Sequence, residues 1–370
     1  MSVVRPLFPD IGVADPRTKG VRAASRHFVA NTALNTTAGH GRAGCGASAI
    51  SRGSDPMPQQ SPRPPVTLHL GAHRTGTTSL QRLLDRNVAH LDRRGVAIWG
   101  PRRTRTGLLA GVMGDPARFS GGDDPHLHRA AGRIAISRAD LSASGIGRLV
   151  ISDENLLGGL RENLLLAQPY PTAGARLRRL DRAVPGIDRV VLAIRAPDAW
   201  WASVFAFLIT RGFAPPDRMT VDAIVAAHYG WRQVILDVAD AMSRARLTVW
   251  TFEDMAVDPA RAFADLTGHK PCGKSVPHLN ASPPLAVLQS RLRDDGCLMT
   301  LPQMAGHYSP FTTRDRAALR ARYQDDLAWL RDGADGRITL GPEAPPQGPF
   351  RDRRRRDGQG RRPQQMDPTG

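Results

Sequence analysis

Two groups of side chains in this sequence have the types and the spacing that bind phosphate. The first lies in the stretch Val66 to Leu84, where an apolar run ends at Gly71 and a helical pattern begins after Gly76. A glycine loop between a strand and a helix directs backbone N–H groups and the positive end of the helix dipole at one point. Arg74 adds a cation inside this loop. Thr77 stands where the nucleotide P-loop has its lysine, which disfavours triphosphate chemistry.

The second group is Arg195 with Ser203. Arg195 ends a predicted strand, and Ser203 follows inside the helix that this strand leads into. A permanently charged, planar guanidinium suits phosphate, and a hydroxyl on the adjoining helix can form a second bond to the same group. The pair therefore predicts a further phosphate site.

Both groups resemble those of sulfotransferases that use 3′-phosphoadenosine 5′-phosphosulfate (PAPS). Arg74-Thr75-Gly76-Thr77-Thr78 is similar to the family's Lys-[Ser/Thr]-Gly-[Ser/Thr]-[Ser/Thr] loop, which holds the 5′-phosphosulfate, with Arg74 in place of Lys. Arg195 and Ser203 match the family's 3′-phosphate site. The resemblance covers about Val66 to Ser282 and implies PAPS as co-substrate and no metal. The implied cofactor-binding residues are Arg74, Thr75, Gly76, Thr77, Thr78, Ser79, Arg195, Ser203 and Lys274.

Two later stretches resemble the family more loosely. Thr251 to Met255 is similar to its Tyr-Glu-Asp-Leu stretch, with Phe252 in place of Tyr. Gly273 to Ser282 resembles a loop found late in many bacterial members, in which Lys274 would close over the nucleotide. The cytosolic branch has Arg-Lys-Gly here and Trp at the position of Ser79. The chain therefore resembles the bacterial or carbohydrate-type branch.

Glu154 is the candidate general base, because a carboxylate that follows a strand near the glycine loop can accept the proton of an acceptor hydroxyl. Many carbohydrate sulfotransferases resemble this chain in offering Glu, whereas the cytosolic branch uses His. Alternatively, Asp153 or Glu154 caps the next helix or pairs with an arginine. Asp153 is the second candidate. Three remoter candidates are His126, His128 and His278.

His69 and His73 frame the glycine loop, and we expect both to be structural or to contact the cofactor. In the implied reaction Arg74 and the loop stabilise charge on the leaving phosphate. Glu154 activates a hydroxyl of a glycan, a glycolipid or a small metabolite. A P-loop kinase of small molecules, and a non-catalytic protein that keeps a nucleotide fold for binding or scaffolding, remain alternatives.

Alternating strands and helices are expected to position these residues. The predicted strands are the run before Gly71, Gly95–Gly100, Arg148–Ser152, Asp188–Arg195 and Arg246–Phe252. Among the predicted helices are Asp222–Met242, Leu285–Arg293 and Arg314–Leu330. This order predicts an α/β fold, a P-loop-type, doubly wound parallel sheet with ligands at the carboxyl ends of its strands. Helical spacing further predicts a group of core residues, Trp200, Val204, Phe207 and Leu208.

Composition sets the outer bounds. A chain of 370 residues can bury a core without disulfides, and its three cysteines are expected to be free thiols. We expect one domain over residues 65–340, with disordered basic segments at 1–64 and 341–370. The net charge of +17 suits an anionic cofactor or an acidic glycan or lipid. Aromatic residues do not interleave with the basic runs, so nucleic acid is not expected.

The sequence also lacks an apolar run of about 20 residues, the length that a membrane helix needs, and the apolar core of a secretory signal. We therefore expect a cytoplasmic protein without a transmembrane segment. The oligomeric state stays open.

Overall fold

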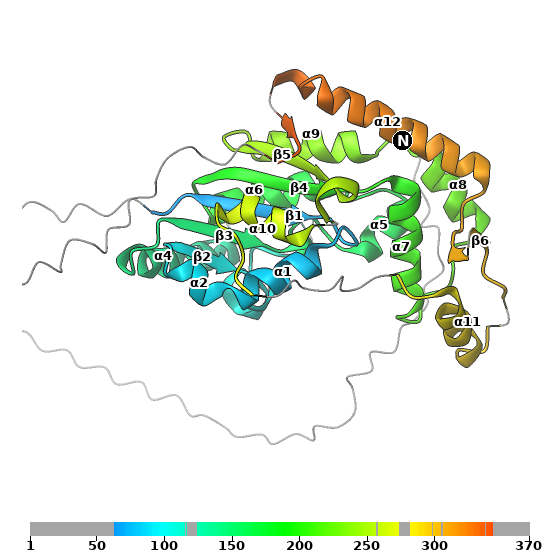
Figure 1. The fold of residues 1–370 in the computed structure, drawn as a ribbon, viewed down its shortest axis with the longest axis horizontal. Coiled ribbons are helices and arrows are strands. Elements are labelled where there is room, and N and C mark those ends of the chain that lie inside the picture. The colour runs from blue at the N-terminus through cyan, green and yellow to red at the C-terminus, as the bar shows by residue number, and fades with distance from the viewer. Residues whose placement is uncertain are drawn as a thin grey trace, which may run out of the picture. The chain divides into compact units, whose positions relative to one another are not determined.

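A six-stranded parallel sheet organises the chain, which this computed structural model describes over residues 63–342 except 115, 117–123, 257, 274–281, 298, 305 and 337. The strand order is β2-β3-β1-β4-β5-β8 (Figure 1). The bounds are β1 (Val66–Gly71), β2 (Val96–Trp99), β3 (Arg148–Ser152), β4 (Ile187–Ile194), β5 (Arg246–Thr251) and β8 (Ile338–Leu340). The predicted α/β fold with a parallel sheet is confirmed. The segments predicted to be disordered, 1–64 and 341–370, lie almost entirely outside the described residues.

Both faces of the sheet are buried, which explains the continuous apolar run Val190 to Ile194 in β4. Along β4, Val190 and Leu192 pack into one core, whereas Val191 and Ala193 pack into the other. β1 lies in the middle of the sheet, paired with β3 on one side and β4 on the other. The carboxyl end of β1, where the glycine loop starts, is therefore flanked by the ends of two other strands.

Helices cover both faces. One core contains side chains of α1 (Thr77–Arg86), α2 (Val88–Asp92) and α10 (Pro259–Thr267). The other contains side chains of α4 (Pro125–Ala143), α6 (Ala173–Ala183), α7 (Pro197–Ile209), α8 (Arg218–Ala226), α9 (Trp231–Ala241), α11 (Leu285–Asp294) and α12 (Thr313–Arg331). The sheet is thus doubly wound, as predicted.

Short elements complete the described chain. Before the first large gap they are α3 (Pro101–Arg103) and the π-helix η1 (Thr104–Leu108). After β3 come the 3₁₀ turn η3 (Glu154–Leu156) and α5 (Leu160–Leu166), and after β5 the π-helix η4 (Phe252–Ala256). Towards the end lie β6 (Gln303–Met304), β7 (His307–Tyr308) and η5 (Ala334–Gly336). Among the described helices, none combines the length and hydrophobicity required to span a bilayer.

Local sequence signals fix several helix starts. Pro125, Pro197 and Pro259 each occupy an early position of a helix, where their missing N–H is not needed. Asp124 and Asp258 precede two of them and accept hydrogen bonds from backbone N–H groups of the first turn.

The single helix predicted over Asp222–Met242 is wrong. The structure has two helices there, α8 and α9, separated by residues 227–230. Gly230 is the N-cap of α9, and its N–H donates to the side chain of Gln233 at 2.9 Å. The apolar period continues through the break because Ile224, Trp231 and Val234 all face the same core. Periodicity alone therefore did not reveal it.

α12 crosses α8 and α9 and docks on α7 near the end of β4 (Figure 1). Asp198, in the first turn of α7, accepts from the Nε atoms of Arg316 and Arg320 on α12, at 3.2 and 2.8 Å. Asp198 is buried, so these two bonds compensate for much of the solvation that its carboxylate loses.

The junction of β1 and α1 needs a residue without a side chain. A Cβ atom added at Gly71 would collide with Oγ1 of Thr77 and lie 2.9 Å from Cε1 of His69. We expect Gly71→Ala to lower the free energy of unfolding by about 1–3 kcal/mol, the usual cost of overpacking. Urea denaturation measures this change.

The control is Gly132→Ala in α4, where an added Cβ meets open space. It should raise the free energy of unfolding by about 0.5–1 kcal/mol, because alanine favours helices. Equal stabilities of the two variants would contradict the close approach of β1 and α1.

Candidate functional site

The backbone of the glycine loop has a conformation typical of anion-binding nests. Arg74 and Gly76 both adopt left-handed conformations, with φ of 66° and 79°. Alternation of this kind turns successive N–H groups toward one side of the chain, as in backbone nests that bind anions. Gly76 is the N-cap of α1 and has no side chain to cap it, and the first turn holds no acid. The positive end of the helix is therefore not neutralised locally.

The hydroxyl side chains of the loop and of the first turn of α1 differ in burial. Thr75 and Thr77 are buried and donate to the carbonyl oxygen of Ala72 at 2.6 and 3.4 Å, so both stabilise the turn itself. Ser79 is buried as well, whereas Thr78 is exposed in the first turn of α1. Of the four predicted hydroxyl contacts, Thr78 is thus best placed to meet a ligand directly.

Two arginines meet at this loop. Nε of Arg74 donates to Oγ of Ser203 at 2.9 Å, and Nη1 of Arg195 donates to the carbonyl oxygen of Arg74 at 3.2 Å. The structure therefore brings together Arg74, Arg195 and Ser203 from three separate elements. Within the described part of the chain, neither arginine forms a direct ion pair with a carboxylate, although the charges of Glu253 and Asp198 act on Arg195. Burial, together with the charge of Arg195, lowers the pKa of Arg74 to about 10.

Aromatic rings support both guanidinium groups. Arg195 lies over Phe252 at 4.3 Å, and Arg74 lies 5.4 Å from the ring of Phe207. Arg211, at the end of α7, lies over the same Phe207 at 4.2 Å. The prediction that Phe207 is a core residue is confirmed only in part, because its ring packs against the core but is partly exposed beneath two cations. Its helical neighbours Trp200, Val204 and Leu208 are buried as expected.

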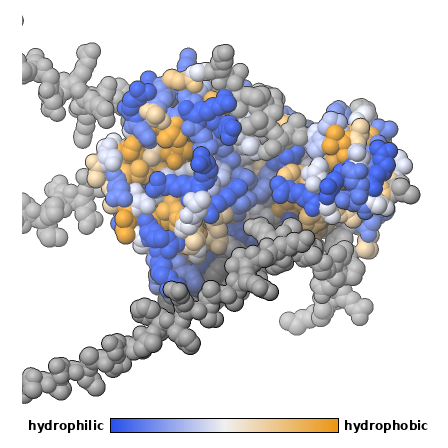
Figure 2. Space-filling model, turned by 90° about the horizontal axis from the view of Figure 1, so that it is seen from below, coloured by the Kyte–Doolittle hydropathy of each residue, from blue (hydrophilic) through white to orange (hydrophobic). Residues whose placement is uncertain are grey.

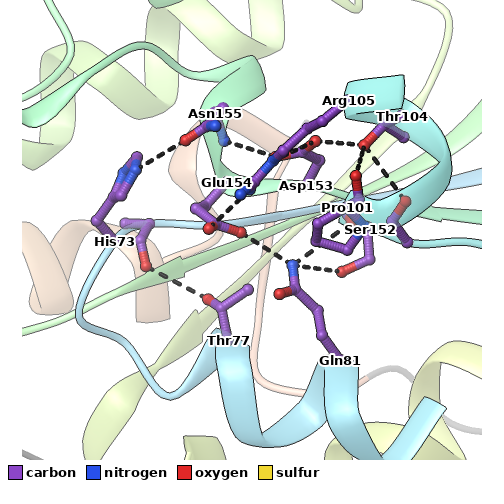
Figure 3. A network of polar contacts seen from close by, with 12 residues as sticks. His73, Thr77, Gln81, Pro101, Thr104, Arg105, Ser152, Asp153, Glu154 and Asn155 are labelled. Atoms are coloured by element: carbon purple, nitrogen blue, oxygen red, sulfur yellow. Dashed lines mark hydrogen bonds and ion pairs between the residues drawn. The ribbon is translucent and has the colours of Figure 1, made fainter. Parts of the chain in front are cut away.

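Glu154 lies in η3, directly after β3, and both of its oxygens are engaged (Figure 3). Oε2 accepts from Nε2 of Gln81 on α1 at 2.9 Å, and Oε1 accepts from Nη2 of Arg105 on η1 at 2.8 Å. Burial alone would raise the pKa of Glu154, but the hydrogen bonds from Arg105 and Gln81 bring it below its ordinary value. The group is consequently ionised at neutral pH.

Asp153 stabilises the local structure after β3. It is fully buried, accepts from the N–H of Asn155 as the cap of η3, and pairs with Nη2 of Arg105 at 2.6 Å. The hydroxyl of Thr104 also donates to it. The second candidate for the base thus caps a turn and pairs with an arginine, the alternative that the sequence left open.

Arg105 is a site residue that sequence reasoning missed. Its guanidinium joins Asp153 to Glu154 (Figure 3), and these hydrogen bonds raise its pKa against the effect of burial. The only signal in the sequence is its place in the cluster Arg102, Arg103 and Arg105 after the second strand. Gln81, one helical turn after Thr77, gave no signal of its own.

His73 is held from four sides. Its N–H donates to Oη of Tyr170 at 2.7 Å, and its carbonyl oxygen accepts from Nε1 of Trp200 at 2.7 Å. Its ring nitrogens Nδ1 and Nε2 lie 2.9 Å from Oη of Tyr170 and 3.0 Å from Oδ1 of Asn155. His73 is therefore firmly bound within the protein.

His69 is buried in β1, with Nδ1 2.9 Å from Oγ of Ser152 and its ring 5.6 Å from that of Trp250. Burial lowers its pKa to about 4, although the nearby charge of Glu154 opposes the shift. His69 is therefore neutral at pH 7.

Several predicted residues fall elsewhere. Lys274 and His278 lie outside the described residues, and His126 and His128 lie on α4. Ser282, at the end of the late loop, lies 2.9 Å from Oγ of Ser203 and so reaches the arginine pair through that hydroxyl. Cys272 and Cys297 are free thiols, as expected, whereas Cys45 is not among the described residues.

Two pockets are notable. One of about 20 Å³ lies against the glycine loop and is lined by Thr75, Gly76, Trp250 and Phe252, among others. One of about 250 Å³ lies between α9 and α12, away from the loop. Figure 2 shows a face of the molecule on which hydrophilic residues predominate and hydrophobic residues form separate patches. The described residues contain no cluster of three His, Cys, Asp or Glu side chains that could hold a metal.

Comparison with models of known protein families finds no match, and a search of curated proteins finds no significant match. The similarity to sulfotransferases therefore depends on the residues quoted above.

The buried His69 predicts a pH dependence of stability. Below pH 6.5 the unfolded chain binds a proton on His69 that the native state does not bind until about pH 4. Stability should therefore fall as the pH decreases through this window, by at most about 1.4 kcal/mol per unit from this group. Between pH 7 and pH 4.5, the free energy of unfolding of the unaltered protein should decrease by about 2 kcal/mol more than that of His69→Asn. The asparagine keeps a polar atom near Ser152 but does not titrate. Urea unfolding at both pH values measures this difference, and equal losses would contradict the burial of a neutral imidazole.

Proposed function

We propose that this protein is a PAPS-dependent sulfotransferase that transfers a sulfuryl group to a hydroxyl of a glycan, a glycolipid or a small metabolite. In this proposal the parallel sheet is of the P-loop type, and the loop after β1 is the phosphosulfate loop.

One observation carries the proposal: two half-buried arginines, Arg74 and Arg195, are held together without a carboxylate partner among the described residues. Like charges in a poorly solvated place raise the free energy of the native state unless an anion neutralises them. The uncapped N-terminus of α1 attracts the same charge. These features suit an anionic ligand, and the sequence resemblance assigns Arg74 to its 5′-phosphosulfate and Arg195 with Ser203 to its 3′-phosphate.

Each residue then has a role. Arg74, Thr78 and the loop N–H groups would hold the 5′-phosphosulfate, and Arg195 with Ser203 the 3′-phosphate. PAPS supplies an activated sulfuryl group. As the acceptor oxygen forms its bond to sulfur, the bond between sulfur and the bridging phosphate oxygen breaks. The proton of the acceptor hydroxyl passes to Glu154, while Arg74 and the helix dipole stabilise the charge that develops on the leaving phosphate.

A second candidate function is non-catalytic nucleotide binding. The observation that favours it is the engagement of both Glu154 oxygens by Arg105 and Gln81, which lowers the pKa of Glu154 and makes it a weak base. A binding protein would need the arginine pair but would have no need for a proton acceptor.

Ligand-induced thermal stabilisation tests the nucleotide site without knowledge of the acceptor. Adenosine 3′,5′-bisphosphate at a hundred times its dissociation constant should stabilise the native state by about 2.7 kcal/mol, a rise of several degrees in Tm. Arg195→Ala should remove most of this rise. Arg244→Ala is the control, because Arg244 is exposed and pairs with Asp181 away from the loop.

ATP with magnesium should stabilise the protein little, because it offers no 3′-phosphate. Stabilisation by ATP equal to that by the bisphosphate would favour the small-molecule kinase and contradict the proposal.

Substitution of the base separates catalysis from binding. Glu154→Gln removes the proton acceptor but keeps the shape of the side chain, so transfer of labelled sulfate from PAPS to acceptors in a cell extract should fall by about two to four orders of magnitude. Binding of the bisphosphate should be nearly unchanged. Glu162→Gln is the control, since Glu162 pairs with Arg176 rather than with the site.

Near-normal transfer by Glu154→Gln would show that another group accepts the proton. If the native protein binds the bisphosphate but transfers no sulfate to any acceptor, non-catalytic binding becomes the better explanation.

A further inference from the structure

Tyr170 has an unusual backbone. Its φ is 47°, in the left-handed region that bulky residues rarely enter, and its side chain is completely buried. It also precedes Pro171, and a residue before proline favours extended conformations. Such conformations persist only where surrounding contacts enforce them, and they concentrate at functional sites.

The contacts that enforce this conformation are visible. The N–H of Tyr170 donates to Oδ1 of the buried Asn163 at 3.0 Å, and its carbonyl oxygen accepts from the N–H of Ala173 at 3.0 Å. Its ring packs 5.9 Å from Trp200 and 6.3 Å from Trp231. The hydroxyl is thereby placed at the glycine loop, which lies far away in the sequence.

The hydrogen atoms at this hydroxyl can be assigned. Oη of Tyr170 accepts from the N–H of His73, so its own hydrogen is available for Nδ1 of the same residue. The tautomer that satisfies both contacts has Nδ1 as the acceptor of this hydrogen and the ring proton on Nε2, which donates it to Oδ1 of Asn155. One hydroxyl thus fixes both the main chain and the tautomer of His73.

We propose that Tyr170 is the positioning residue of the glycine loop: through His73 it holds the loop in its anion-receiving form and joins it, by way of Asn155, to the turn that carries Glu154. The nucleotide part of this inference rests on the function proposed above. Tyr170 itself does not touch the ligand. It holds the residue directly before Arg74, so displacement of His73 would displace the guanidinium as well.

The surroundings favour a neutral His73. Burial lowers its pKa and Arg105 reinforces this shift, whereas the charge of Glu154, the hydrogen bond to Asn155 and the charge of Asp153 oppose it. Burial also raises the pKa of Tyr170, so its hydroxyl stays protonated. At neutral pH both groups therefore keep the hydrogens that the Tyr170–His73–Asn155 contacts, here called the clamp, require.

The test compares Tyr170→Phe, which keeps the ring but loses the hydroxyl, with Tyr229→Phe. Tyr229 is a matched control because its hydroxyl also donates to a protein group, Asp237 at 2.6 Å, but not to the loop. Three measurements are made on the full chain. The first is ¹⁵N NMR of the His73 imidazole, whose signal is assigned by its loss in His73→Gln. The second is amide hydrogen exchange of residues 73–77, and the third is affinity for adenosine 3′,5′-bisphosphate.

Unaltered protein and Tyr229→Phe should show the Nε2–H tautomer of His73, with a titration midpoint below the ordinary histidine range, because burial lowers its pKa. In Tyr170→Phe the imidazole should titrate at higher pH, loop amides should exchange faster, and affinity for the bisphosphate should fall about tenfold. Circular dichroism checks that the variant is folded.

Unchanged loop exchange in a folded Tyr170→Phe protein, or an unchanged His73 spectrum, would overturn the clamp. Faster loop exchange with unchanged affinity would overturn its role in ligand binding. If the native protein binds no bisphosphate while Tyr170→Phe still loosens the loop and frees His73, the clamp stands and the proposed function fails.

Discussion

The approach of Arg74 to Arg195 is the interaction on which the rest of this site depends. A guanidinium stays charged in almost any surroundings, so two of them in a partly buried place both lose solvation and repel each other. Burial first, and then the charge of Arg195, lower the pKa of Arg74. The fold must therefore hold them there by other contacts. Hydrogen bonds through the Arg74 carbonyl and Ser203, and the rings beneath each cation, do so. Such stored repulsion is relieved when an anion binds.

The sequence predicted the parts of this protein that depend on local signals. The strands are short runs rich in apolar residues, and the glycine loop is marked by Gly71 and Gly76, so most of the sheet and the position of the loop could be read from the sequence. Arg195 and Ser203 were predicted because each lies at a defined place on a strand or the helix that follows it. Their meeting with Arg74 follows from the parallel sheet, which collects strand ends at one edge.

Other parts depend on contacts between segments that are distant in the chain. Tyr170 reaches His73 only because its backbone bends into a rare conformation, and no composition or period marks that bend. Arg105 could be noticed as one of several basic residues, but its choice of Asp153 and Glu154 as partners is set by tertiary packing. The break before α9 and the short strand β8 were missed because the apolar pattern hides the first, and three residues carry little signal for the second.

The contact between α12 and α7 has a consequence for the order in which the protein matures. Burial lowers the pKa of Arg195, and the charges of Glu253 and Asp198 oppose this shift. One oxygen of Asp198 also accepts hydrogen bonds from Arg316 and Arg320 on α12. While the chain is being synthesised, α12 leaves the ribosome long after α7. Until it docks, the buried carboxylate of Asp198 lacks these partners. The last long helix of the described chain therefore supplies partners to a carboxylate whose charge acts on Arg195 only as folding ends, so under the proposed function the nucleotide site would be completed late.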